Sequence, residues 1–308
     1  MSTTRRTQWL LAIIVFVALA FLPVIDQPYW LTIGISILMY GVLATSWALF
    51  SGPTHYISLA TAAFYGLGAY VVGMGIESVW YPFLLVIATA LGALLALVVG
   101  WATLRLSGVY FVIFTLGLAE FIRQIITWVQ NNFTGSRGVY VLTSIEDKHI
   151  FWELLVLAAV VCLSGVWLKQ SRLGFALRVI GGDEVVASHV GIHSAKAKVL
   201  LFSFSGAVAA LTGAILAPRL SYIEPSMVFS ADLSFQVVIM ALLGGVHRLW
   251  GPIVGVIPFT FLWEFIAAVA PTQTVLLLGV AFLVIVYFIP QGIAGLIEKW
   301  FLKGGRHE

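Results

Sequence analysis

Long apolar runs separated by short polar breaks make up most of this chain. About 20 apolar residues are needed to cross a hydrocarbon core of about 30 Å, and in lipid a helix pairs its own backbone polar groups. Ten runs are expected to form helices, at approximately residues 9–25, 29–50, 57–76, 82–103, 109–129, 151–168, 198–218, 234–246, 251–270 and 273–290. The eighth run is short for a span. The pattern predicts an all-α, polytopic transmembrane bundle of about ten helices.

The distribution of basic residues predicts how the bundle is oriented. Cytoplasmic loops of membrane proteins carry an excess of Lys and Arg. With the amino terminus inside, twelve of the 16 basic residues fall on the cytoplasmic side or at its interface: Arg5, Arg6, Arg105, Lys169, Arg172, Arg178, Lys196, Lys198, Arg248, Lys299, Lys303 and Arg306. The other four face outward: Arg123, Arg137, Lys148 and Arg219. Both termini are therefore predicted to be cytoplasmic, with residues 130–149 outside and 169–197 inside.

The composition supports a membrane protein and argues against other classes. Of the 308 residues, 61% are hydrophobic and 9% are charged, whereas a soluble domain is about a quarter charged. The net charge of +3 comes from scattered residues, which argues against a nucleic-acid partner. Arg5 and Arg6 precede a first run that is followed at once by another, so an uncleaved helix is favoured over a signal peptide. Residues 1–308 are interpreted as a single membrane domain.

One short helix is predicted in the inner loop at about residues 169–197. In the stretch GFALRVIGGDEVVASHVGI, residues 174–192, Asp183 is a good N-cap and Gly191 is well placed as a left-handed terminator. A helix of about seven residues between them is too short to be stable alone. Its apolar side chains lie beyond the predicted membrane edge: Val185, Val186 and Val190. These residues leave two partners open, another protein or the chain's own cytoplasmic face.

Three charged residues within the apolar runs are candidates for the pathway or for the bundle interior. Glu120 and Arg123 are three apart in the fifth run, so they can pair on one helix face. Charges at membrane depth are costly and are functional candidates by default, although a structural ion pair buried within the bundle is favoured for these two. Glu264 in the ninth run has no obvious local partner. It is expected either to line the pathway or to bond across helices.

Motifs for catalysis and metal binding are absent from the sequence. A nucleotide-hydrolysing loop ends in Gly-Lys followed by Ser or Thr, and the chain has no Gly-Lys dipeptide. The single cysteine, Cys162, excludes an internal disulfide and a cysteine-based metal site. His189 and His193 are four apart, but Gly191 should end the helix between them and no third ligand is evident. We expect no enzymatic activity, no cofactor and no metal in this chain.

Four segments, in order along the chain, carry a resemblance to a known family. They are SLATAAFYGLGAY at residues 58–70, LRLSGVYFVIFTLGLAE at 104–120, TGSRGV at 134–139 and ALLGGVHRLWGPIVG at 241–255. Together they resemble the LivM and LivH type permeases of ABC importers for branched-chain amino acids, and the LivM branch more closely. The chain departs from the family pattern at four positions where solute selectivity could be set: Pro53, His55, Ser136 and Arg137.

The inner loop resembles the segment by which such permeases dock on their ATPase. Asp183 and Glu184 match the acidic start of that pattern, and Ala187 matches its second alanine, while Val186 stands in place of the first. Gly191 and Ile192 match its end. The set that the resemblance assigns to ATPase coupling also includes Gly174 and Arg178, which come earlier in the same loop.

The resemblance implies a permease subunit of an ATP-driven importer in the bacterial inner membrane. Its solutes would be branched-chain amino acids or related small molecules such as urea, amides or aromatic carboxylates. The implied partners are a second, related permease, two cytoplasmic ATPase subunits and an extracytoplasmic solute-binding protein. The alternative class is a stand-alone secondary transporter or channel, in which Glu120, Arg123 and Glu264 would form a proton or ion relay.

Overall fold

The chain folds as a bundle of apolar helices. The computed structural model describes residues 27–103, 108–135, 138–182, 184–189, 191–246 and 248–270 without gaps, together with a few residues on either side. In this part of the chain, seven helices are long and apolar enough to cross a membrane. The predicted all-α transmembrane bundle is therefore confirmed. The runs predicted at 9–25 and 273–290 lie mostly outside the described residues.

Most observed helices coincide with the predicted runs. The helices are α2 (Pro28–Thr54), α3 (Thr61–Gly75), α4 (Tyr81–Thr103), α5 (Val109–Val129), α6 (Asp147–Gln170), α7 (Arg172–Gly182), α8 (Glu184–His189), α9 (Ser194–Leu216), α10 (Pro225–Val228), α11 (Ala231–Gly244) and α12 (Gly251–Val269). Shorter elements are the π-helical turn η2 (Gln130–Thr134), the 3₁₀ turn η3 (Ala217–Arg219) and the strands β1 (Val139–Tyr140) and β2 (Tyr222–Ile223).

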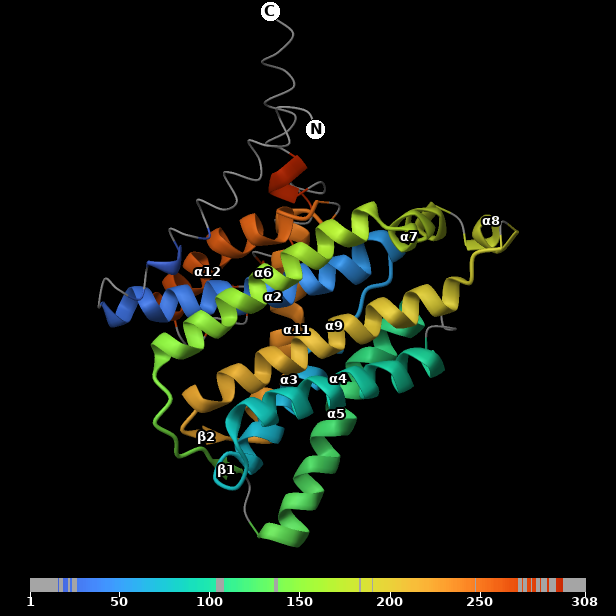
Figure 1. Ribbon diagram of the computed structural model, residues 1–308. Helices are drawn as coiled ribbons and strands as arrows, with labels where there is room; N and C mark the ends of the chain where they lie inside the picture. Colours follow the sequence, from blue (N-terminus) through green and yellow to red (C-terminus); the bar gives the residue numbers. More distant parts are fainter. Residues whose placement is uncertain are drawn as a thin grey trace, which may run out of the picture.

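The helices α2, α6 and α9 run side by side through the bundle, with α7 and α8 at one end and the strands at the other (Figure 1). Burial falls from the centre outward: 72% of the α2 span and 67% of the α9 span are buried, against 22% of the α5 span. The α7 end carries six basic residues: Lys169, Arg172, Arg178, Lys196, Lys198 and Arg248. At the strand end, Arg219 pairs with Asp147 at 3.5 Å. The charge asymmetry in the sequence thus corresponds to two opposite ends of the bundle.

Small residues bring the backbones of α3, α4 and α9 into contact. A β-carbon at Gly68 would lie 1.8 Å from the carbonyl oxygen of Ala210, and one at Gly213 would lie 2.0 Å from that of Tyr65. On α4, a β-carbon at Gly92 would lie 2.3 Å from the Ala210 methyl group. Such close approaches are typical of membrane helices, where dispersion contacts between backbones replace the hydrophobic effect as the driving force.

The prediction of a continuous helix over 57–76 is wrong at its start. The helix α2 ends at Thr54, its C-cap His55 has a left-handed φ of 58°, and helix α3 begins only at Thr61. The intervening residues are non-helical, and α3 has 15 residues, too few to cross a bilayer. Non-helical backbone is tolerated at membrane depth when protein groups satisfy it. The groups that do so here are described with the site below.

Two further features were not predicted. The 11-residue helix α7 lies in the inner loop, with Gly174, Leu177 and Ile180 on its buried face; it is too short and too polar to give the signal of a span. The strands β1 and β2 pair antiparallel, with Val139 opposite Ile223. This short ladder joins the outer loop to the segment that follows α9.

Candidate functional site

The inner loop is anchored to the bundle through α7. A β-carbon at Gly174 would lie 1.9 Å from the carbonyl oxygen of Leu168, at the end of α6. A β-carbon at Gly181 would lie 2.2 Å from the carbonyl oxygen of Pro53, at the end of α2. Both glycines therefore permit backbone contact, and Gly174 has a packing role within this chain. The helix α7 is thus packed against α2 and α6, and α8 follows it in the chain.

The short helix predicted in this loop is present as α8. Gly191 adopts a φ of 79°, and the backbone N–H of Ile192 donates to the carbonyl oxygen of Ala187 at 3.0 Å. This bond across five residues, around a left-handed glycine, is the Schellman termination of a helix. The left-handed terminator at Gly191 is therefore confirmed. Asp183, its predicted N-cap, lies outside the described residues.

The two sides of α8 differ in their exposure. Ala187 is fully buried, with an exposed fraction of 0%, and belongs to the chain's own apolar core. Its methyl group therefore packs within this chain. Val186, next to it, is 52% exposed, and His189 is also exposed. Among the α8 side chains that the structure describes, Val186 and His189 thus face outward.

A buried lysine connects the end of the inner loop to the non-helical segment before α3. Lys198, on the first turns of α9, has an exposed fraction of 0%. Its Nζ donates to the Tyr56 hydroxyl at 3.0 Å and lies 4.2 Å from the centre of the Tyr56 ring. On the same segment, the carbonyl oxygen of Ser58 accepts a bond of 2.7 Å from the Trp47 indole. A displacement of α9 would therefore act directly on the residues that lead into α3.

Hydroxyl groups from three elements hold the start of α3 inside the bundle. The backbone N–H of Leu59 donates to Thr115 Oγ1 on α5 at 3.0 Å, and that of Ala62 donates to Ser234 Oγ on α11 at 2.9 Å. Ser58 Oγ accepts from the N–H of Ala60 at 3.3 Å. The first N–H groups of a helix have no partner within it, and here side chains supply one. Two short helices, α3 and α11, thus meet at their amino-terminal ends.

Glu120 and Arg123 form the predicted ion pair, but their predicted burial within the bundle is wrong. An Arg123 amino group bonds Glu120 Oε1, which also accepts from Gln124 Nε2 at 2.8 Å. The side chains are 53% exposed for Glu120 and 32% exposed for Arg123. They are exposed because α5 packs against the bundle along one narrow face and projects away from it (Figure 1). An exposed polar cluster halfway along a membrane helix is not stable against hydrocarbon.

Glu264 lies half-buried on α12. Within the described residues, no hydrogen bond or ion pair involves its carboxylate. The structure therefore shows no bonded relay between Glu264 and either Glu120 or Arg123.

The remaining residue of the predicted coupling set, Arg178, points into a cavity beneath α7. Its Nε donates to the carbonyl oxygen of Gly174 at 3.3 Å.

The described part of the chain is a multi-pass helical bundle with a short, partly exposed helix, α8, at one end. The family model of the branched-chain amino acid transport system permease component matches residues 29–288, and the chain belongs to this family. The resemblance stated from the four segments is thereby confirmed at the level of the family.

Relatives within the family are distant but extensive. The high-affinity branched-chain amino acid permease protein LivH of Salmonella typhimurium is 24% identical over 83% of this chain and 91% of its own length. LivM of Escherichia coli is 24% identical over 95% of this chain and 76% of its own. The ribose import permease RbsC of Haemophilus influenzae is 26% identical over 59% of this chain and 58% of its own. No solved structure matches the chain significantly.

Proposed function

We propose that this chain is a membrane-spanning permease subunit of an ATP-driven importer for branched-chain amino acids or related small organic solutes. The family match over residues 29–288 supports the permease role. Relatives named for branched-chain amino acid transport and for ribose import support a small organic solute. We infer a multi-pass location in the bacterial inner membrane, with the α7 end cytoplasmic, since six described basic residues gather there.

The observation that carries the coupling role is the outward face of α8. The helix has six residues, far fewer than the 12 or so needed for stability in water, and its Val186 side chain is exposed. A groove on a cytoplasmic ATPase would cover this valine. Two such ATPases, a second permease and an extracytoplasmic binding protein complete the proposed assembly, and hydrolysis of ATP takes place in the ATPases.

The chain of contacts behind α8 suggests how movement would reach the membrane. A shift of α8 is transmitted to α9, where Lys198 holds Tyr56. Tyr56 leads into the start of α3, which is fixed by hydroxyls from α5 and α11. Because α5 presents its polar cluster away from the bundle, we place the translocation path, or the second permease, against this face.

Replacing Val186 by Asp tests the coupling role directly. The new carboxylate would have to lose its water in the ATPase groove, so ATPase co-purification and uptake of leucine should both fall at least about tenfold. Gln170→Asp is the matched control, because it adds the same charge at the same end of the bundle on an exposed residue outside α8. The abundance of this chain in membranes should be unchanged in both variants. Wild-type co-purification in Val186→Asp would refute the docking role of α8.

The proposed orientation has its own test. Single cysteines replace Ser144, on the strand side, and Ala195, on the α7 side, in a Cys162→Ala background; both positions are exposed. A membrane-impermeant thiol reagent added to intact spheroplasts should label the first and not the second. The reverse labelling would mean that the α7 end, with the proposed ATPase-binding helix α8, faces away from the cytoplasm, and it would contradict the proposed orientation.

A further inference from the structure

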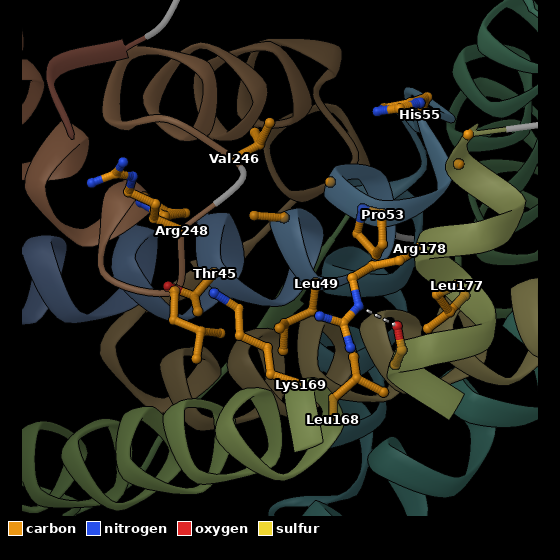
Figure 2. Close-up of a pocket in the computed structure, with 17 residues that line it drawn as sticks. Thr45, Leu49, Pro53, His55, Leu168, Lys169, Leu177, Arg178, Val246 and Arg248 are labelled. Atoms are coloured by element: carbon orange, nitrogen blue, oxygen red, sulfur yellow. Dashed lines mark hydrogen bonds between the residues drawn. The ribbon is translucent and has the colours of Figure 1, made fainter. Parts of the chain in front are cut away.

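A charged cavity lies where several membrane helices end together, beneath α7. Its volume is about 480 Å³, and its walls come from the ends of α2 and α6, from α7 and from the loop before α12. Lys169 and Arg178 reach into the space between α2, α6 and α7, while Arg248 lies further off, over its own neighbour Trp250 (Figure 2). Among the described residues that line this cavity, none is Asp or Glu. The cavity therefore concentrates positive charge.

A second cavity adjoins the first and has the opposite character. Its volume is about 390 Å³, and its lining is almost wholly apolar. Leu49 and Leu168 line both cavities. Two residues of its rim, Trp167 and Leu200, are 67% and 59% exposed, so this cavity faces the outside of the bundle. In a membrane, that surface is in contact with lipid.

We propose that the two cavities together bind one anionic phospholipid of the adjacent leaflet. The phosphate group lies between Lys169 and Arg178, and an acyl chain follows the apolar cavity past Leu49 and Leu168. A basic pocket at the ends of membrane helices is a preferred site for an acidic lipid headgroup. A small soluble anion would match only the first cavity. A zwitterionic lipid such as phosphatidylcholine carries a phosphate too, but the basic cavity would repel its quaternary ammonium group. The basic cavity and the apolar cavity together match a molecule that has both an anionic headgroup and an apolar chain.

The site also has a consequence for the inner loop. A phosphate bound by Lys169 and Arg178 bridges the end of α6 to α7, the helix that carries α8. Neither cation has an acidic partner among the described residues, so a bound anion would reduce the repulsion between them. The lipid would therefore help to hold α7 in place. This inference is independent of the transported solute.

Native mass spectrometry of the full chain, extracted in neutral detergent with its co-purifying subunits, can detect the lipid. The probes are dioleoyl-phosphatidylglycerol, dioleoyl-phosphatidylcholine and free inorganic phosphate. Wild-type protein should bind the anionic lipid selectively. The double variant Lys169→Gln/Arg178→Gln should bind it roughly 30-fold more weakly, because each basic residue contributes about 1 kcal/mol. Phosphate at the same concentration should not compete.

A matched control separates this site from general surface charge. Arg172→Gln/Lys196→Gln removes two exposed basic residues at the same end that line neither cavity, and it should bind the lipid as wild type does. Equal loss in both double variants, or no loss in Lys169→Gln/Arg178→Gln, would overturn the proposal. Competition by inorganic phosphate would instead show a soluble-anion site. As a second variant, Ala207→Leu fills the apolar cavity and should weaken binding of the lipid without changing the charge.

Discussion

Two regions of the molecule differ in how tightly they pack within this chain: the contact between α3 and α9, and the helix α5. At the contact, the backbones touch: β-carbons at Gly68 and Gly213 would lie 1.8 and 2.0 Å from carbonyl oxygens of the facing helix. On α5, a β-carbon at Gly117 would meet nothing within 4 Å. The first region is complete within this chain, whereas the second presents an unfilled surface.

The difference separates helices that are packed within this chain, such as α9, from α5, whose exposed surface another molecule would cover. Buried helices such as α9 are held by contacts that leave no room for adjustment. The α5 span is only 22% buried and carries a polar cluster around Glu120 that hydrocarbon would not tolerate. We therefore expect substitutions in the contact to act on folding, and substitutions on α5 to act on assembly and transport.

The largest expected effect is that of Gly68→Ala. Its methyl group cannot fit beside the carbonyl oxygen of Ala210 unless α3 and α9 separate, so we expect a loss of about 3 kcal/mol or more of folding free energy. Thermal unfolding of the detergent-solubilised chain measures the loss. Gly117→Ala is the matched control and should be neutral or slightly stabilising, because Ala favours the helix. Equal unfolding temperatures for the two variants would contradict the assignment of the contact.

An intermediate effect is expected where α3 begins. Thr115→Val removes the acceptor for the N–H of Leu59, and a buried unpaired N–H costs about 1–3 kcal/mol. Thr89→Val is the matched control, because within the described part of the chain Thr89 bonds only the carbonyl oxygen of Leu85, in its own helix. The same unfolding measurement compares the two valine variants. A Thr89→Val variant as unstable as Thr115→Val would mean that the cap of α3 contributes nothing.

The positions of most helices followed from the sequence because lipid forces apolar runs to be helical. The runs at 29–50, 82–103, 109–129 and 251–270 match α2, α4, α5 and α12 within a few residues. The break before α3 did not follow, because it depends on Thr115 and Ser234, which are distant in the sequence and lie beside it only after folding. The Ser-Leu-Ala-Thr sequence itself gives no strong helix stop.

The candidate site could be predicted only in part, because some of its features are local in the sequence and others depend on how the chain folds. The termination of α8 at Gly191 is local chemistry, since a left-handed residue favours glycine, and it was predicted correctly. The inward direction of Ala187 was not predictable, because it depends on how α8 sits against the rest of the chain. Likewise, the i and i+3 spacing gave the pairing of Glu120 with Arg123, but not the exposure of the helix face that carries them.

The smallest effect on folding is expected at this ion pair, and it is the sharpest test of what α5 is for. A partly exposed pair contributes up to about 1 kcal/mol, so Glu120→Gln and Arg123→Gln should each unfold close to the wild-type temperature. In the assembled transporter, either variant leaves one charge without its partner against the path or the second permease, and uptake of leucine should fall in both. The double variant leaves no unpaired charge, so its uptake should exceed that of either single variant. If the double variant is as impaired as the two single losses combined, each charge acts by itself, and a relay through Glu120 and Arg123 becomes the better account of α5.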